Sequence, residues 1–230
     1  MKSGAHLVLL LCCGSAVAQV TVTANVGFAG KTNANPANVA VWLVPLTPAP
    51  TMTSTNSVRP RLVQKNKSFE PHILIVPVGT EVEFPNHDPF FHNVFSLFEG
   101  KRFDLGLYEA GTTRNVLFDK PGISYIFCNI HAEMSAVIIA VNTRYYGVSD
   151  RQGRVTIADV PPGKYALHVW YETASPETLN ALTHEIVVGS QPTVLGTLHL
   201  PAPGSVPPHK NLYGHDYPPP TPDQPVYAKP

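Results

Sequence analysis

Short stretches in which apolar and polar residues alternate recur along most of the chain after residue 19. Alternation with a period of two is typical of β-strands that bury one face, because successive side chains point to opposite faces. The predicted strands are Val20–Thr23, Val39–Leu43, Ile73–Val76, Glu81–Phe84, Ser124–Cys128, Val137–Val141, Val155–Ile157, Tyr165–Tyr171, Glu185–Val188 and Val194–Leu200. Very little of the sequence has a helical period. The pattern therefore predicts an all-β fold.

Residues that favour turns separate these strands. The turn segments are Gly79-Thr80, Asn86-His87-Asp88-Pro89, Lys120-Pro121-Gly122, Arg151-Gln152-Gly153 and Pro161-Pro162-Gly163. Many short strands joined by Gly, Pro and Asp turns are typical of antiparallel β-sandwiches. Residues 48–56 are rich in Thr, Ser and Pro, which predicts a loop or hinge.

The first 18 residues have the pattern of a secretory signal peptide. Lys2 precedes an apolar run from Leu7 to Cys13, and Ala16-Val17-Ala18 is a small-x-small cleavage site. Cleavage is predicted after Ala18, and the protein is expected to be secreted, into the bacterial periplasm. No apolar run long enough to span a membrane follows, so no transmembrane segment is expected in the mature chain.

The composition excludes some classes of partner and indicates one further segment of the chain, a Pro-rich tail. The 230 residues include 16 basic and 16 acidic side chains, so charge indicates neither a nucleic-acid nor an anionic-membrane partner. The length allows one large or two small domains. Of 24 prolines, ten lie in residues 201–230, which predicts a Pro-rich disordered tail.

Removal of the predicted signal peptide changes the number of cysteines in the chain. Cys12 and Cys13 leave with it, so Cys128 is the one cysteine of the mature chain. A disulfide scaffold is excluded. A single thiol in an oxidising compartment is expected to be either buried and inert or a metal ligand.

Cys128 lies in a segment that combines three metal-binding side chains. Cys128, His131 and Met134 follow the pattern Cys-x2-His-x2-Met, after a strand that opens at Gly122, and His92-Asn93 lies upstream. One thiolate, two imidazoles and one thioether are the ligand set of a blue-copper site, in which His2Cys is trigonal and Met is a weak axial ligand. Cys-x2-His alone also occurs in zinc sites, but the further Cys and His residues of a zinc finger are missing.

Residues 58–142 resemble the cupredoxins, in particular plastocyanin and amicyanin-like periplasmic proteins. The matching stretches are Phe69-Glu70-Pro71, Val76-Pro77-Val78-Gly79-Thr80, Phe84-Pro85-Asn86-His87-Asp88, His92-Asn93-Val94-Phe95-Ser96 and the Cys128 segment. The resemblance implies a Greek-key β-sandwich with one type 1 Cu(I)/Cu(II) ion held by His92, Cys128, His131 and, axially, Met134. It also implies that the Asn93 side chain ties the two ligand loops together while its backbone N–H points at the thiolate. His72 and His87 do not fall on ligand positions.

A second resemblance covers the segment that follows. Val148–Ile157 and Val160–Leu167 are similar to the carboxypeptidase regulatory-like, or transthyretin-like, β-sandwich. Our hypothesis is that residues 19–50 and 143–200 form this second, smaller sandwich, with the cupredoxin inserted between them. The alternative is that the first strands pair with the cupredoxin. His168, Trp170, His184 and His199 are expected to be packing or surface residues.

The expected function is single-electron transport between transient protein partners, with the electron leaving by the exposed edge of His131. Pro89, Phe90 and Ala132 are candidates for an apolar patch around that edge. The alternatives are a copper carrier or buffer without redox traffic and a structural or carbohydrate-binding sandwich. Because His-x-His pairs and hydrolase motifs are absent from the sequence, the chain is expected not to be an enzyme.

Overall fold

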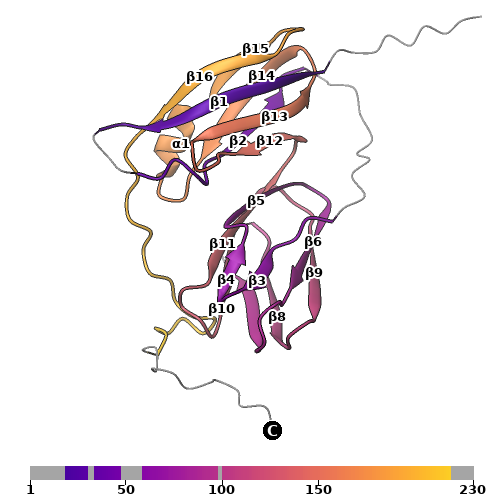
Figure 1. Cartoon of the computed structure of the whole chain (residues 1–230), viewed down its shortest axis with the longest axis vertical. Coiled ribbons are helices and arrows are strands. Elements are labelled where there is room, and N and C mark those ends of the chain that lie inside the picture. Colours follow the sequence, from indigo (N-terminus) through magenta and orange to yellow (C-terminus); the bar gives the residue numbers. More distant parts are fainter. Residues whose placement is uncertain (1–18, 31–33, 48–58, 98–99, 219–230) are drawn as a thin grey trace, which may run out of the picture.

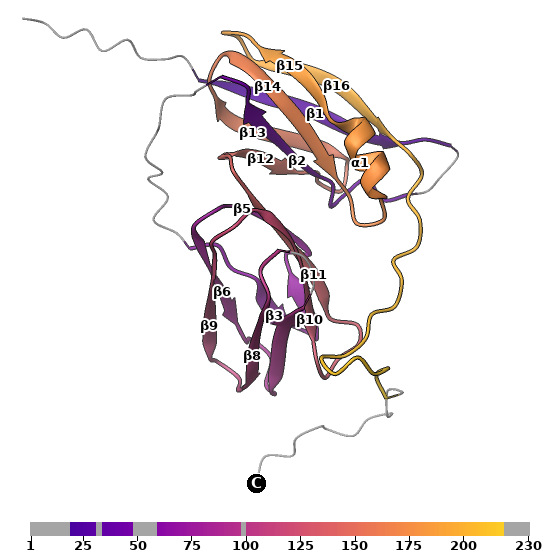
Figure 2. The same cartoon turned by 180° about the vertical axis from the view of Figure 1, so that it is seen from behind.

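A computed structural model describes residues 19–30, 34–47, 59–97 and 100–218 (Figure 1). The predicted signal peptide and the last residues of the predicted tail lie outside this part of the chain. The prediction of an all-β fold is confirmed: the described residues form strands β1 to β16 and a single short helix. The strands belong to two β-sandwiches that lie one above the other in Figures 1 and 2.

The first sandwich contains the segment that resembles cupredoxins. Its larger sheet has five strands in the order β5 (Ile73–Pro77), β11 (Ser135–Val141), β10 (Gly122–Cys128), β7 (His92–Ser96) and β8 (Phe103–Tyr108). Facing it are the pairs β3 (Val63–Lys65) with β4 (Ser68–Glu70) and β6 (Thr80–Pro85) with β9 (Thr113–Phe118). The buried core between them includes Phe84, Phe118, Ile126 and, close to the site described below, Cys128 and Met134.

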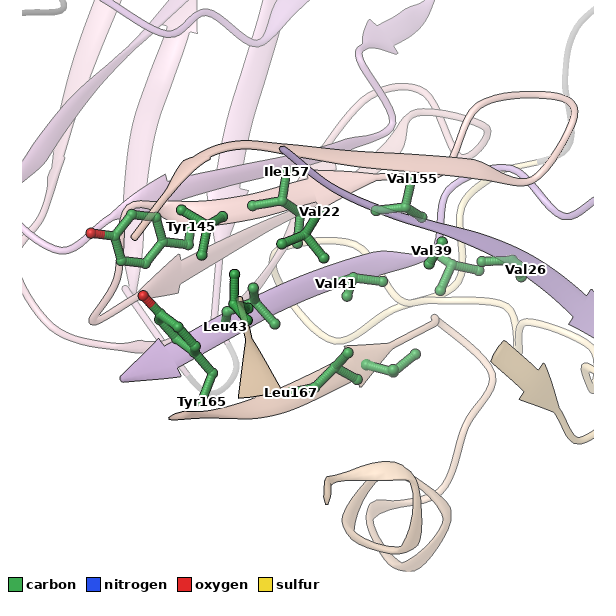
Figure 3. Close-up of a cluster of buried hydrophobic side chains, with 14 of the residues drawn as sticks. Val22, Val26, Val39, Val41, Leu43, Tyr145, Val155, Ile157, Tyr165 and Leu167 are labelled. Atoms are coloured by element: carbon green, nitrogen blue, oxygen red, sulfur yellow. The ribbon is translucent and has the colours of Figure 1, made fainter. Parts of the chain in front are cut away.

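The second sandwich is built from both ends of the chain. One sheet has the order β13 (Arg154–Val160), β1 (Val20–Phe28) and β16 (Thr193–Leu200). The other has the order β12 (Tyr145–Val148), β2 (Ala40–Pro45), β14 (Gly163–Trp170) and β15 (His184–Val188). β2 therefore pairs with β12 and β14. Figure 3 shows the core between the sheets, in which Val22, Val41, Leu43, Ile157 and Leu167 meet.

A third apolar cluster joins the two sandwiches. Ile73 and Ile75 of β5 pack with Ala40 of β2 and Trp170 of β14, and Val137, Ile139 and Val141 of β11 belong to the same cluster. The alternate residues of β11, such as Ile138, face the core of the first sandwich. Because β11 is buried on both faces, its sequence is continuously apolar rather than alternating. Beside this cluster, His72 Nε2 lies 2.8 Å from Glu172 Oε2.

One helix interrupts the strands where no helical period was recognised. Helix α1 (Pro176–Leu182) begins after Ser175, whose side chain accepts a hydrogen bond from the Thr178 N–H. Proline at the first turn follows the usual preference, since it has no N–H to leave unsatisfied there. With seven residues, α1 is too short to show a clear apolar period. In the described part of the chain, no helix has the length and hydropathy of a membrane span.

The chain after β16 differs from the disordered tail that its composition predicts. Residues 201–218 form no helix or strand, and Figures 1 and 2 show them running beside the first sandwich to the end at which β10 stops. There they make hydrogen bonds to the segment around Asn129. Proline and polar residues hinder regular secondary structure without preventing such contacts.

Candidate metal centre

The proposed ligands come from two neighbouring strands of the five-stranded sheet. β7 and β10 are antiparallel, with Phe95 opposite Phe127 and Val94 opposite Cys128. This register places His92, at the start of β7, beside residues 128–134, which we call the ligand loop. His92 and Cys128 lie 36 residues apart in sequence, and it is the sheet that brings them together.

The three strongest candidate ligands meet in the interior. One ligand atom from each of His92, Cys128 and His131 lies within 4.8 Å of the other two. Cys128 Sγ is 3.6 Å from Nδ1 of His92 and 3.6 Å from Nδ1 of His131. His92 and Cys128 are fully buried, and His131 is 8% exposed. A thiol and two imidazoles therefore converge on one enclosed point.

These separations fit a bound metal ion. Metal–sulfur and metal–nitrogen bonds of about 2.3 and 2.0 Å, at about 120° to each other, place sulfur and nitrogen about 3.7 Å apart. The observed 3.6 Å for both pairs agrees with a trigonal arrangement around one ion. A soft thiolate with two imidazoles is a donor set that suits copper, and without a full set of four Cys or His ligands it is less typical of structural zinc.

Met134 closes the ligand loop. Its N–H donates to the His131 carbonyl over 3.1 Å, and its own carbonyl accepts from the Cys128 N–H over 3.3 Å. The side chain is fully buried in the same core as Cys128. The loop thus holds three of the four predicted ligands within a short segment, and the role of Met134 as axial ligand remains a prediction.

Asp88 is a site residue that the sequence reasoning missed. Its Oδ2 lies 2.8 Å from Nε2 of His92, and only 5% of Asp88 is exposed. Because a carboxylate accepts, Nε2 carries the proton and Nδ1 is left to face Cys128, as metal-bound histidines require. Aspartate four residues before a histidine is too common to reveal this pair without a structure.

A hairpin turn holds Asp88 in place. The backbone N–H groups of Asn66 and Lys67, between β3 and β4, donate to the two oxygens of Asp88 over 2.6 and 3.0 Å. Both turn residues have positive φ, 55° and 53°, as a type I′ turn requires. Burial by itself would raise the pKa of Asp88, but the hydrogen bonds from His92 and from this turn lower it. The carboxylate is therefore ionised and its orientation is fixed.

The surroundings shift the proton equilibria of the candidate ligands. Burial raises the pKa of the Cys128 thiol, opposed by hydrogen bonds from the N–H groups of Ile130, Asn93 and His131. Burial lowers the pKa of both His92 and His131, which keeps the imidazoles neutral and able to bind a metal. These backbone hydrogen bonds favour a thiolate at Cys128, and a metal cation would supply the remaining stabilisation.

Asn93 agrees with only half of its predicted role. A hydrogen bond from its backbone N–H acts to lower the pKa of the Cys128 thiol. The side chain, however, donates to Asp104 of β8 over 2.7 Å, and its buried Oδ1 has no hydrogen-bond partner among the described residues. The ligand loops are joined instead through backbone, by the Asn129 N–H donating to the Asn93 carbonyl over 3.3 Å. The expectation for the side chain is corrected, because the β7–β8 pairing brings Asp104 within its reach.

Phe90 covers the site on its outer side. Its ring centroid lies 5.2 Å from that of His92 and 5.6 Å from that of His131. Pro89 and Ala132 are exposed nearby in sequence, and Phe90 is half-buried. The structure thus leaves apolar atoms around the most accessible of the candidate ligands.

The other described histidines lie outside the cluster. His87 is exposed in its turn, and His72 bonds to Glu172 and to the Ser135 carbonyl. His184 and His199 lie on the second sandwich, away from the candidate ligands, while His168 stacks on Trp42 with centroids 5.2 Å apart. Trp170 is buried between the two sandwiches.

Comparison with solved structures finds copper proteins over part of the chain. A purple cupredoxin from Nitrosopumilus maritimus is 21% identical, covers 36% of this chain and 99% of its own, and has a TM-score of 0.33. An amicyanin variant in its Cu(I) state is 16% identical, over 36% of this chain and 82% of its own, with a TM-score of 0.34. No protein-family model and no curated protein sequence matches. At these TM-scores, the interpretation of the site rests on its own geometry.

One further match corrects a prediction. A copper-containing nitrite reductase from Thermus scotoductus is 25% identical over 44% of this chain, with a TM-score of 0.36, and this chain spans about a quarter of it, 26%. The prediction that the chain is not an enzyme is withdrawn, since one of the structures similar to part of it is an enzyme. Missing His-x-His pairs in one chain are not sufficient grounds for that exclusion.

Proposed function

We propose that this chain is a copper protein that carries single electrons, with His92, Cys128 and His131 as the main ligands and Met134 as a weak axial ligand. The observation that carries the proposal is the convergence of a buried thiol and two buried imidazoles, with both S···N distances at 3.6 Å. Copper, when bound, supplies a Cu(I)/Cu(II) couple and so accepts or gives one electron.

The protein's own residues favour such chemistry by keeping the site rigid. Asp88 fixes the ring of His92, and backbone hydrogen bonds from Asn93, Ile130 and His131 act to lower the pKa of the Cys128 thiol. Thiolate and thioether suit Cu(I), and imidazoles suit both oxidation states. A fixed ligand set that both states accept needs little rearrangement when an electron moves.

We further propose where the electron leaves and what the second sandwich is. His131 is the most exposed of the four, so partners of small contact area would approach beside it, over Pro89 and Phe90. Residues 58–142 would be a cupredoxin domain inserted into a transthyretin-like sandwich of residues 19–50 and 143–200, which the pairing of β2 with β12 and β14 supports. The signal peptide would direct the chain to the periplasm.

The test is the visible absorption spectrum of the protein loaded with Cu(II). A Cu–thiolate bond gives an intense band, and we expect it in the natural chain and not in Cys128→Ala. Cys128 is the one cysteine of the mature chain, so no other thiol can produce the band. A colourless protein, or an unchanged band in Cys128→Ala, would overturn the proposal.

A redox titration separates electron transport from copper storage. An electron carrier shows reversible bleaching and recovery of the band, with copper retained throughout. Release of the metal on each reduction would instead identify a carrier or buffer. The near-complete burial of the three ligands favours retention.

A further inference from the structure

The chain after β16 returns to the ligand loop and folds against it. Residues 209–217, which we call the strap, lie 77 to 89 residues after the loop residues that they contact. A local turn shapes the strap: the Asn211 side chain accepts from the N–H groups of Tyr213 and His215, each over 3.0 Å. Lys210 and Asp216 form an ion pair across it. The strap is therefore a structured segment within the Pro-rich tail.

Three hydrogen bonds join the strap to the ligand loop. The Tyr217 hydroxyl donates to the Cys128 carbonyl over 2.7 Å, and the Leu212 N–H donates to Asn129 Oδ1 over 2.8 Å. His209 Nε2 lies 2.9 Å from the Ala132 carbonyl, which can only accept, so Nε2 carries a proton. These contacts are distributed along the first part of the loop, from Cys128 to Ala132.

Aromatic packing accompanies the hydrogen bonds. The His209 ring stacks on Phe127, the residue before Cys128, with centroids 4.0 Å apart and planes 26° apart. Tyr217 packs edge-on against His209 at 5.2 Å. The strap therefore contacts the chain from Phe127, near the end of β10, to Ala132, the residue after His131.

The loop's own backbone contacts are longer than those the strap adds. Within the loop, the Cys128–Met134 and His131–Met134 hydrogen bonds measure 3.3 and 3.1 Å. The strap's three contacts measure 2.7 to 2.9 Å. A movement of this short loop that separates Cys128 from His131 would have to break the strap's contacts as well.

We propose that the strap is part of the metal centre, and that His209 and Tyr217 are positioning residues that fix the ligand loop and slow the exchange of copper. This rests on the copper function proposed above. Neither residue touches the ligand atoms; each acts through a backbone carbonyl of the loop. The strap also borders Ala132, so a partner approaching His131 from that side would meet it.

The experiment compares two full-length double variants. His209→Ala with Tyr217→Phe removes the His209 imidazole and the Tyr217 hydroxyl, the two groups that bond to carbonyls of the loop. His215→Ala with Tyr213→Phe makes the same chemical changes in the same strap, at an exposed histidine and a tyrosine that is 71% exposed. The measurement is the rate at which excess bathocuproine disulfonate removes Cu(I) from the reduced protein. We expect the first pair to raise this rate at least about tenfold, as loss of groups that hold metal ligands commonly does, and the control pair to leave it within about twofold. Equal rates in both double variants would overturn the proposal.

A second measurement keeps this proposal separate from the copper assignment. Backbone amide hydrogen exchange of residues 128–134 in the metal-free protein reports how readily the ligand loop opens, and the strap's contacts should make opening less frequent. Faster exchange in His209→Ala with Tyr217→Phe, but not in the control pair, supports the strap. If that result accompanies a protein without a Cu–thiolate band, the copper function fails while the strap's contact with the loop stands. Unchanged amide exchange in His209→Ala with Tyr217→Phe would overturn the proposal that the strap fixes the ligand loop.

Discussion

The two sandwiches of this chain bury different kinds of side chain. The core of the second is almost entirely apolar, and its buried polar residues are Thr143 and Ser149. Among its described residues, the first sandwich buries eight polar ones, and these are Gln64, Asn86, Asp88, His92, Asn93, Ser96, Ser124 and His131. Buried polar groups cost free energy unless they are paired. Their concentration in the first sandwich indicates that this sandwich holds a functional site, whereas the second sandwich is stabilised by apolar packing.

Some of the buried polar residues of the first sandwich, from Gln64 through Tyr108, Asn86 and Asp88 to His92, are connected by hydrogen bonds. Gln64 donates to the Phe84 and Pro85 carbonyls and contacts the Tyr108 hydroxyl, while Asn86 donates to the Phe90 carbonyl. Asn86 also accepts from the Asp88 N–H, which connects this network to the carboxylate that holds His92. The second sandwich has no comparable chain of buried side chains among its described residues. Three substitutions test this difference between the sandwiches: one in the apolar core of the second sandwich, one in the polar network of the first, and one at the junction between them.

The largest expected effect is on stability, from the apolar core of the second sandwich. Leu167 is fully buried there, and Leu167→Ala should lower the free energy of unfolding by about 2–5 kcal/mol through lost contacts and a cavity. The Cu–thiolate band should keep its position, since no ligand is touched. Thermal denaturation followed by circular dichroism measures the loss, and Val187→Ala, at a side chain that is 68% exposed, is the control. A shifted Cu–thiolate band in Leu167→Ala would contradict the conclusion that the second sandwich serves packing and the first holds the site.

A smaller effect, on metal affinity, is expected from the polar network of the first sandwich. Asp88→Asn removes the charge that orients His92 and should weaken copper binding about 10–100-fold. Competition with a chelator measures the affinity. Asp119→Asn, at an exposed carboxylate paired with Lys101, is the matched control and should leave the affinity unchanged. Equal affinities for the two variants would show that Asp88 does not position His92.

The smallest effect is expected at the junction between the sandwiches. The hydrogen bond to Glu172 raises the pKa of His72, with burial acting in the opposite direction. A raised pKa means that the contribution to stability is full below the unfolded value of about 6.5 and is lost as the pH rises through the folded value. Because His72 is one-third exposed, the contribution should stay below about 1 kcal/mol.

This contribution is measured by comparing the natural chain with His72→Gln. The variant should be less thermally stable than the natural chain at about pH 5.5, below the unfolded pKa, and the difference should shrink at about pH 9. Glu172→Gln should reproduce the effect, because it removes the other partner of the same pair. A difference that grows as the pH rises would show that the protonated form of His72 does not stabilise the junction.

Much of the fold was accessible from the sequence where one face of a strand is buried. Tyr165–Tyr171 and Val155–Ile157 alternate clearly, and the structure has β14 and β13 there. β7 was not recognised as a strand because all five of its residues are buried, which removes the alternation. α1 and the short pair β3–β4 were also missed, since seven and three residues are too few to show a period.

The sequence by itself determined the all-β class and brought the candidate ligands to attention, because strand periodicity and ligand chemistry are local properties of residue type and spacing. Three of the four candidate ligands share one short loop, so their proximity followed from the chain alone. Only the tertiary structure decided that Asp88 orients His92, that Asn93 turns its side chain to Asp104, and that the strap grips the ligand loop. Each of these contacts depends on how strands pair and how segments pack, and such geometry leaves no periodic signal in the sequence.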